Sequence, residues 1–281
     1  MKMNLILQGP PNELARIAAI ADPARVVTLP NGAVRAEDVE AGERVRAAVS
    51  LAAFPAGVDA TFIAAGRTLA DFKLVAMDMD STLITIECID EIADMQGLKA
   101  EVSAITEAAM RGELDFAASL ARRVALLEGL DASALERVYD ERLRLSPGAE
   151  TMLAGVQAAG LKTLLVSGGF TFFTERLQAR LGLDYAHANV LEVREGKLTG
   201  KVVGGIVDAL EKRRTVERTC ADLGVGPQQA IVMGDGANDL QMMSIAGLSV
   251  AFRAKPVVRV QATIALNFSG LDALLTILPE S

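Results

Sequence analysis

The chain has 281 residues, 51% of them hydrophobic, and a formal net charge of −8. At roughly 150 residues per domain, this length suggests two domains or one large one. The acidic balance disfavours nucleic acid and anionic membrane surfaces as partners, because both require a basic face on the protein. An anionic small-molecule substrate must therefore be held by local positive groups or by a metal ion.

Cysteine usage and hydropathy bear on the compartment. Cys88 and Cys220 lack metal-ligand spacing and suggest no disulfide framework, so we expect free thiols in a reducing environment. The N-terminal apolar run is too short for a signal peptide. No stretch approaches the ~18 uninterrupted apolar residues of a membrane span, since the longest candidate, residues 47–58, contains Pro55. These features predict a cytoplasmic protein that does not enter a membrane.

Residues 1–70 are predicted to form a small α/β unit that is separate from the rest of the chain. Short apolar segments alternate there with stretches of helical character. The expected strands are Leu5–Leu7, Arg25–Thr28 and Val58–Ile63, and the expected helices are Asn12–Ala21 and Val39–Ala53.

Four short apolar runs stand out in residues 71–281. Amphipathic stretches follow the first three runs, a pattern typical of βαβ units and of a parallel sheet with helices on both faces. We therefore expect an α/β fold with a Rossmann-like parallel sheet. The runs are Leu74–Met77, Leu161–Val166, Ile231–Met233 and Leu248–Phe252.

Two further elements are predicted around these strands. Residues 84–148 keep helical spacing and end at Ser146-Pro147-Gly148, so we expect an inserted helical cap over the strand ends. Alternating segments on either side of Glu195-Gly196 predict a β-hairpin over Val190–Val203.

Polar residues directly follow the first three apolar runs. They therefore lie at the carboxyl ends of the expected strands, which is where ligands bind in parallel sheets. Asp78 and Asp80 can converge on one point as the first strand ends, and paired hard oxygens suit Mg²⁺. A carboxylate can also attack phosphorus. On its own, however, such a pair occurs often by chance and is more often a solvated acidic loop. Asp235 adds a carboxylate after the third run and favours a metal site, although Asp239 can also cap the next helix.

Positive and neutral groups for an anion are also present. Ser167-Gly168-Gly169 offers a hydroxyl and backbone N–H groups at a helix N-terminus, but it is also a common turn. Lys212 opens a basic run that is either an exposed helix start or a fixed cation that offsets phosphate charge. The single histidine, His187, and the absence of a Cys-x₅-Arg pattern argue against phosphohistidine and cysteine-based phosphatases.

The combined order of these motifs resembles the haloacid dehalogenase superfamily of aspartyl-phosphate hydrolases over Phe72 to about Pro256. Within it, the chain is similar to the phosphoserine phosphatases, whose reaction ends serine biosynthesis. The segments that carry this likeness are Asp78–Ala93, Met110–Val124, Val166–Phe170 and Ala251–Pro256.

This resemblance implies roles for the acidic residues. Asp78 would be the nucleophile, and Asp80 would protonate the leaving oxygen and then activate water. Asp78, the backbone carbonyl of Asp80 and Asp235 would bind Mg²⁺. Asp239 would support the metal site.

The resemblance also implies how phosphoserine would be held. Glu87 would face its ammonium and Arg123 its carboxylate, although Glu87 also fits an ordinary helix start and the neighbouring Arg122 is a rival. The phosphate would contact Ser167, Gly168, Lys212 and Asn238.

Three questions stay open at this level. The enzyme could act on another small phosphomonoester or transfer phosphate to another alcohol, which would not need Glu87 and Arg123. A rival from a different class is a signalling module that keeps its aspartyl-phosphate. The cap and the second aspartate, Asp80, argue against this rival because both serve turnover. Residues 1–70 resemble a regulatory-type domain, and they could bind serine, promote a homodimer or stabilise the catalytic part.

Overall fold

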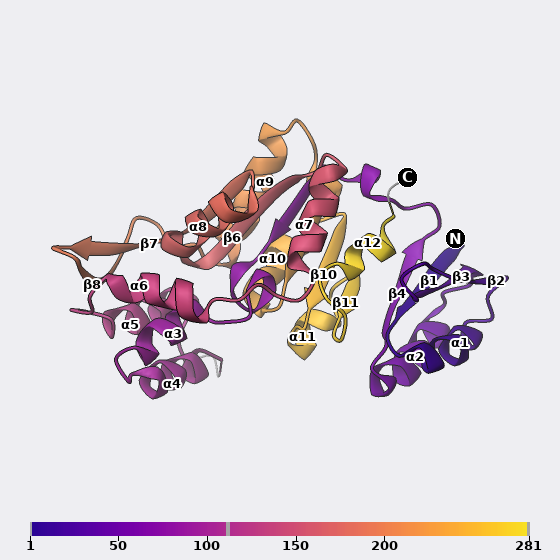
Figure 1. Ribbon diagram of the computed structural model, residues 1–281, viewed down its shortest axis with the longest axis horizontal. Helices are drawn as coiled ribbons and strands as arrows, with labels where there is room; N and C mark the ends of the chain where they lie inside the picture. Colours follow the sequence, from indigo (N-terminus) through magenta and orange to yellow (C-terminus); the bar gives the residue numbers. More distant parts are fainter. Residues whose placement is uncertain (1, 111–112, 280–281) are drawn as a thin grey trace.

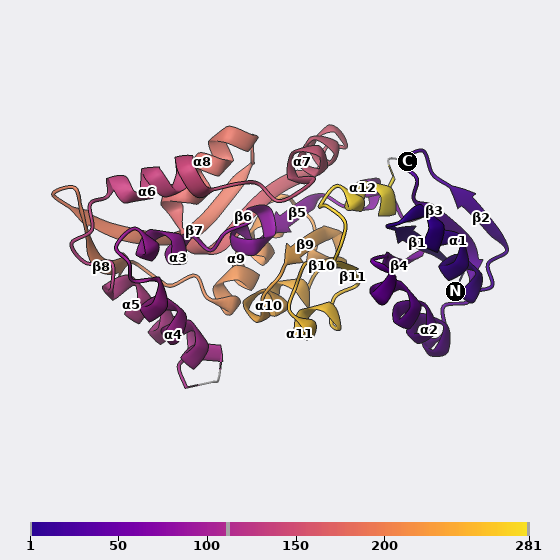
Figure 2. The same ribbon diagram turned by 60° about the horizontal axis from the view of Figure 1, so that its bottom comes forward.

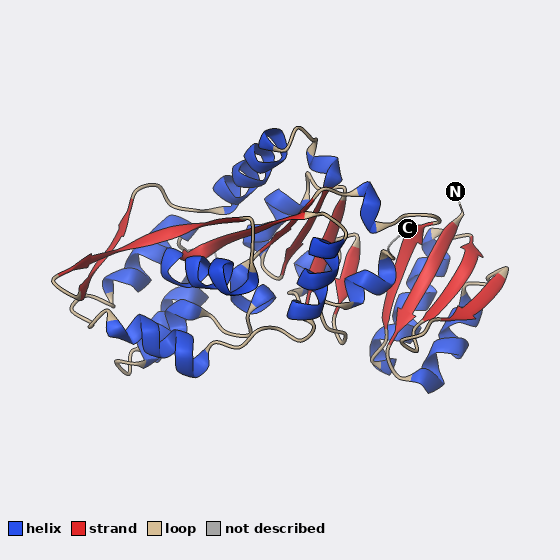
Figure 3. Ribbon diagram, turned by 45° about the horizontal axis from the view of Figure 1, so that its top comes forward, coloured by secondary structure: helices blue, strands red, loops and turns tan. Residues whose placement is uncertain are grey.

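Two separate β-sheets organise the chain, as the computed structural model of residues 2–110 and 113–279 shows (Figure 1). The smaller sheet is antiparallel, has the order β2-β3-β1-β4, and carries α1 and α2 on one face (Figure 3). Leu14 and Ile17 of α1 and Val49 of α2 pack on Leu5 and Leu7 of β1 in its core. Its elements are β1 (Met3–Gln8), α1 (Pro11–Ile20), β2 (Arg25–Thr28), β3 (Val34–Val39), α2 (Glu43–Ala53) and β4 (Asp59–Ala64).

The strand β3 corrects one expectation. Residues 34–39 form a strand, and the helix expected over Val39–Ala53 begins only at Glu43. The pattern there is compatible with a helix, but Val34, Ala36 and Val39 are buried because β3 pairs with both β1 and β2. Tertiary pairing therefore overrides local propensity at this position.

The larger sheet has seven strands in the order β11-β10-β9-β5-β6-β7-β8. All neighbours are parallel except β7 and β8, which form the expected antiparallel hairpin. The predicted Rossmann-like parallel sheet is therefore confirmed. Its strands are β5 (Leu74–Met77), β6 (Lys162–Phe170), β7 (Tyr185–Arg194), β8 (Lys197–Val203), β9 (Ala230–Gly234), β10 (Leu248–Phe252) and β11 (Ile264–Leu266).

Helices cover both faces of this sheet. Successive residues of β5 show the two layers, because Val75 and Met77 enter one hydrophobic cluster and Leu74 and Ala76 enter the other. Strands buried on both faces read as continuous apolar runs, which is why β5 was visible in the sequence. The first cluster receives α7 (Ala149–Ala158), α8 (Thr171–Leu181) and α12 (Ala273–Ile277), and the second receives α9 (Ala209–Asp222), α10 (Leu240–Met243) and α11 (Pro256–Arg259).

An inserted helical region follows β5 and lies beside the β7–β8 hairpin (Figures 1 and 2). An isolated bridge between Ile84 and Leu145 closes its base. Residues 111 and 112, which belong to the motif Met110–Val124, lie outside the described residues. The helices of this region are α3 (Cys88–Asp94), α4 (Lys99–Met110), α5 (Phe116–Ala125) and α6 (Ser133–Arg137), followed by a π-helical turn (Val138–Arg142).

The small sheet is fixed to the edge of the large one through Asp59. This buried carboxylate at the start of β4 accepts hydrogen bonds from the backbone N–H groups of Asn267, Phe268 and Ser269, at 2.7, 3.1 and 2.8 Å. The loop that donates them directly follows β11. In the part of the chain that the structure describes, no helix is long and apolar enough to span a membrane.

Candidate active site

One pocket lies where the carboxyl ends of the central strands meet the helical cap. The end of β6 and the residues that directly follow β5 and β9 form its floor, while Glu87 before α3 and Phe116, Leu120 and Arg123 of α5 line it from the cap. None of its lining residues comes from the described part of the small N-terminal sheet. Eight predicted site residues line this pocket: Asp78, Asp80, Glu87, Arg123, Ser167, Gly168, Asp235 and Asn238.

The remaining two predicted residues, Lys212 and Asp239, lie directly behind the pocket. The Lys212 ammonium is 2.8 Å from Asp78 Oδ1 and 2.7 Å from Asp239 Oδ1, and the residue is 0% exposed. Asp208 caps the helix α9 and so places Lys212 on its first turn, facing inward. The interpretation of Lys212 as an exposed helix start is therefore wrong.

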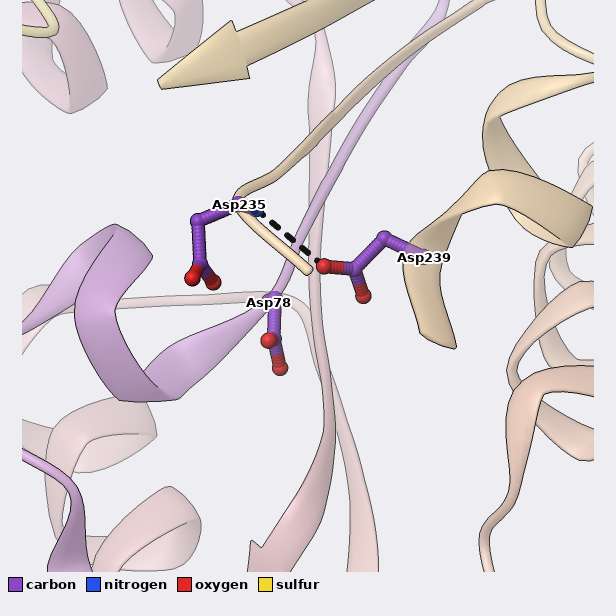
Figure 4. Close-up of side chains that lie close together, drawn as sticks. All are labelled: Asp78, Asp235 and Asp239. Atoms are coloured by element: carbon purple, nitrogen blue, oxygen red, sulfur yellow. Dashed lines mark hydrogen bonds between the residues drawn. The ribbon is translucent and has the colours of Figure 1, made fainter. Parts of the chain in front are cut away.

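Electrostatics in this cluster favour a bound cation. Three carboxylates, those of Asp78, Asp235 and Asp239, have oxygens within 4.8 Å of one another (Figure 4). With all three carboxylates ionised, the one ammonium, that of Lys212, leaves the cluster with a net charge of −2. Burial first, and then the charge of Asp239, raise the pKa of Asp78 well above its usual value. The hard-oxygen set and its charge fit a divalent metal ion.

Asp239 differs from the other two carboxylates in its hydrogen bonds. Its Oδ2 accepts from the backbone N–H of Asp235 at 3.2 Å (Figure 4) and from that of Gly236 at 3.0 Å. Its Oδ1 accepts from Lys212. Asp78 and Asp235 each keep an oxygen without such a partner among the described residues. Asp78 and Asp235 therefore have a carboxylate oxygen available for a ligand, whereas both oxygens of Asp239 already accept hydrogen bonds.

Local backbone geometry places Asp78 and Asp80 on the same pocket. The tight turn Met79–Leu83 follows β5, and Asp80 and Ser81 depart from helical dihedral angles within it. Asp80 Oδ1 accepts a hydrogen bond of 3.2 Å from the backbone N–H of Cys88. Loss of solvent, followed by the charge of Glu87, raises the pKa of Asp80 to about 7. A carboxyl group with this pKa can donate and accept a proton near neutrality.

An irregular turn within the C-terminal end of β6, where the pairing with β7 shifts register between Val166 and Phe170, brings a buried hydroxyl and backbone to the same point. Ser167 Oγ accepts a hydrogen bond of 2.8 Å from the N–H of Gly169. A Cβ atom at Gly169 would lie 2.8 Å from the Met79 side chain and 2.9 Å from Asp80 Oδ2. A side chain at position 169 would therefore require Met79 and Asp80 to move, whereas glycine lets this turn approach them closely.

Sequence reasoning missed Asn189, which holds the same turn from β7. Its side-chain amide donates to the carbonyl of Gly168 at 2.7 Å and accepts from the N–H of Val207 at 2.8 Å. Asn189 is 1% exposed. The available signal was an amide inside an apolar segment, because a buried amide requires hydrogen-bond partners.

The structure separates other candidates that the sequence left open. Arg123 lines the pocket, whereas Arg122 is exposed and lies outside its lining. His187 lies on β7, half-buried and 3.7 Å from Glu211, in agreement with a structural role. Phe116 and Lys255 also line the pocket. Both belong to motifs quoted above, but they received no role from the sequence.

Fold and site together define a class of hydrolases with a parallel α/β sheet, in which carboxylates from two strand ends meet under a helical cap. The family model of haloacid dehalogenase-like hydrolases matches residues 75–244. A phosphoserine phosphatase of Polaromonas sp. is 60% identical over 212 residues, which cover 74% of this chain and 90% of that protein. The chain therefore belongs to the phosphoserine phosphatases of the haloacid dehalogenase superfamily.

Solved structures agree with this assignment. A haloacid dehalogenase family hydrolase from Salmonella enterica serovar Typhi superposes with a TM-score of 0.91, at 32% identity over 100% of both chains. A phosphoserine phosphatase with an analogue of its phospho-aspartyl intermediate gives a TM-score of 0.69 at 39% identity, covering 74% of this chain and 99% of that one. The first similarity includes the small N-terminal sheet.

Proposed function

We propose that the chain hydrolyses O-phosphoserine to serine and phosphate, the last step of serine biosynthesis, through an aspartyl-phosphate on Asp78. The observation that carries the proposal is the arrangement of one pocket. It offers a buried carboxylate beside Lys212 at its floor, and a carboxylate and a guanidinium, Glu87 and Arg123, on its cap side. These groups are complementary to a phosphate, an ammonium and a carboxylate on one small molecule.

In the first step the free carboxylate oxygen of Asp78 attacks phosphorus in line with the ester bond. The phosphorus–oxygen bond to serine breaks, and the serine oxygen takes the proton of Asp80, without which an alkoxide is a poor leaving group. The other oxygen of Asp78 stays hydrogen-bonded to the Met79 N–H at 2.8 Å and to Lys212. The nucleophile is therefore held in one orientation before the substrate arrives.

In the second step Asp80 takes a proton from water, whose oxygen attacks the phosphorus of the aspartyl-phosphate. Inorganic phosphate leaves and Asp78 regains its carboxylate. The same residue thus acts as acid and then as base, which a pKa of about 7 allows.

We propose Mg²⁺ as the ion of the acidic cluster, held by Asp78, the backbone carbonyl of Asp80 and Asp235. Mg²⁺ prefers oxygen ligands and shares its coordination with substrate phosphate, so it would supply charge neutralisation at the transferring group. Asp235 is oriented for this role by Thr82, whose hydroxyl donates to Asp235 Oδ1 at 3.3 Å.

The phosphate would lie between Asp78 and the turn at the C-terminal end of β6. The Ser167 hydroxyl and the Gly168 N–H would donate to its oxygens, and Lys212 would offset its charge. Asn238 also lines the pocket and completes the set. Closure of the cap would exclude bulk water during the first step.

A phosphate-release panel with Mg²⁺ tests the proposal, comparing phosphoserine, phosphothreonine, phosphohomoserine and sugar phosphates. We expect the highest kcat/KM for phosphoserine and no turnover for Asp78→Asn. A preference for a sugar phosphate would instead support the alternative of a related phosphatase, or of a phosphotransferase if an added alcohol accepts the phosphate. Retention of the phosphoryl group without steady phosphate release would support a signalling module.

The division of the chain is part of the proposal. Residues 1–70 would form a regulatory-type domain, and residues 71–281 the catalytic core with its cap at about 84–148. Support comes from the two separate sheets and from the absence of described residues 2–70 in the pocket lining. Deleting residues 1–68 should leave hydrolysis detectable, and a soluble, folded fragment without activity would contradict this division.

Compartment and assembly complete the proposal. Cys88 and Cys220 are free and buried, as expected for a cytoplasmic protein. The small domain would promote a homodimer, and light scattering of the full chain tests this directly. A monomer at micromolar concentration would reject the homodimer without affecting the catalytic proposal.

A further inference from the structure

Ser81 has an unusual backbone conformation for a residue with a side chain. Its φ is +55° and its ψ is 4°, within the turn Met79–Leu83 that carries Asp80. Glycine, and to a lesser degree asparagine, adopt this left-handed region readily, whereas a Cβ atom is disfavoured there. Strained conformations of this kind concentrate at functional sites, so the side chain of Ser81 deserves a specific explanation.

The hydroxyl of Ser81 donates a 2.7 Å hydrogen bond to Glu87 Oε1. Glu87 occupies the N-cap position of α3, but its side chain makes no capping hydrogen bond. No second hydrogen-bond partner of this carboxylate exists among the described residues. The Ser81 hydroxyl is therefore the contact that fixes an otherwise free, solvent-exposed side chain in one orientation.

The hydroxyl is not needed to hold the turn itself. Backbone hydrogen bonds close it from Leu83 to Asp78 at 3.3 Å and from Ile84 to Met79 at 3.0 Å. A third bond runs from the Ser81 N–H to the carbonyl of Ile86 at 3.2 Å. Since the backbone alone defines the loop, the side-chain hydrogen bond serves Glu87 and not the fold.

We infer that Ser81 is a positioning residue that sets the specificity of the enzyme for an amino-bearing phosphate ester. It holds Oε1 of Glu87 and leaves the other carboxylate oxygen without a hydrogen-bond partner among the described residues, in a side chain that lines the pocket together with Asp80 and Arg123. The inference rests on the proposed function, in which Glu87 receives the ammonium of phosphoserine. A fixed carboxylate binds an ammonium better than a mobile one, because its ordering cost is already met in the free enzyme.

The variant Ser81→Gly tests this, because it removes the hydroxyl while keeping the backbone unstrained. Two substrates are compared: phosphoserine, and 3-phosphooxypropanoate, which has the same phosphate ester and carboxylate but no amino group. We expect kcat/KM for phosphoserine to fall about tenfold, mostly through KM, because a hydrogen bond to a charged group is lost. For the desamino ester it should change less than about twofold.

Glu87→Gln and the double variant Ser81→Gly/Glu87→Gln separate positioning from a general effect on the turn. In the Glu87→Gln background, removal of the hydroxyl should cause no further loss on phosphoserine, because the group that it positions is already altered. Independent, additive losses would overturn the inference. Equal losses on both substrates would also overturn it, since the turn and not Glu87 would then be affected.

The failure of this inference is distinguishable from the failure of the proposed function. A wild-type enzyme that does not hydrolyse phosphoserine rejects the proposed function. A wild-type enzyme that prefers phosphoserine, with Ser81→Gly equally selective, rejects the role of Ser81 alone. Thermal unfolding of Ser81→Gly should show a Tm no lower than that of the wild type.

Discussion

The ammonium of Lys212 lies 2.8 Å from the carboxylate of Asp78, and both side chains are almost completely withdrawn from solvent. Burial alone would lower the pKa of Lys212, but its contacts with Asp239 and Asp78 outweigh this and hold that pKa above its usual value. Lys212 therefore carries its charge at every physiological pH. Its position gives an acidic protein one fixed positive charge directly beside the carboxylates of the pocket.

Replacing Lys212 by methionine should abolish activity and destabilise the protein. Two buried carboxylates would lose their ammonium partner, which costs about 3–5 kcal/mol when a buried pair is broken from one side. Urea unfolding and phosphate release measure the two effects. The exposed Lys201 provides a control, and Lys201→Met should change neither. A Lys212→Met enzyme with normal stability would contradict the buried triad.

Replacing Asp80 by asparagine should slow turnover, and the step that slows should depend on whether the leaving group needs a proton. Loss of a general acid or base typically costs about 10²–10⁴-fold in rate. The aryloxide of an aryl phosphate is a good leaving group without protonation. Transfer of phosphate from an aryl phosphate to Asp78 should therefore survive in the variant, while hydrolysis of the aspartyl-phosphate slows. We expect a stoichiometric burst of nitrophenol from p-nitrophenyl phosphate in rapid mixing. A first step equally slow for both substrates would argue against the acid role.

Arg123 and Arg122 form a matched pair, since they are neighbours on α5 and only Arg123 lines the pocket. Arg123→Ala should raise KM for phosphoserine about tenfold or more, because a charge-assisted hydrogen bond to the substrate carboxylate is lost. Arg122→Ala should leave KM unchanged. Initial rates over a range of phosphoserine concentrations measure both. Equal loss for Arg123→Ala on an aryl phosphate would count against the carboxylate role.

Removal of the metal should make stability depend on pH. Burial of the side chains away from solvent raises the pKa of Asp80 to about 7 and that of Asp235 to about 6. The folded protein then binds these protons more tightly than the unfolded chain, so stability is fully present below the unfolded pKa near 4. It is lost as the pH rises through 6 and 7.

Thermal unfolding at pH 5 and pH 8 measures this effect. With EDTA, Tm should be lower at pH 8. With excess Mg²⁺ the difference should shrink or reverse, because the ion binds the deprotonated carboxylates. A Tm that is independent of pH with EDTA would contradict the raised pKa values of Asp80 and Asp235.

The link through Asp59 should matter for stability and not for catalysis. Asp59→Ala leaves three backbone N–H groups of residues 267–269 without their acceptor, which should cost about 1–3 kcal/mol. Urea unfolding measures the loss, and limited proteolysis should detect easier cleavage between the two sheets. Activity on phosphoserine should be unchanged. A large fall in kcat would show that the small domain acts on the active site.

Sequence alone determined the central strands and the acidic floor of the site. Leu74–Met77 and Leu248–Phe252 were predicted with the bounds that the structure shows, because strands buried on both faces are continuous apolar runs. The edge strand β11 and the strand β3 were missed. Their short or mixed segments become strands through backbone pairing, of β11 with β10 and of β3 with β1 and β2.

Tertiary structure alone decided the partners of these carboxylates. Periodicity identifies where a strand ends, so it placed Asp78 and Asp235 at the same edge of a sheet. Periodicity carries no information on which side chains of a helix face the site. It therefore did not determine the burial of Lys212 or decide between Arg123 and Arg122. The hydrogen bond from Ser81 to Glu87 likewise depends on a left-handed backbone residue. Local patterns encode strands, but contacts between side chains arise only when separate elements pack.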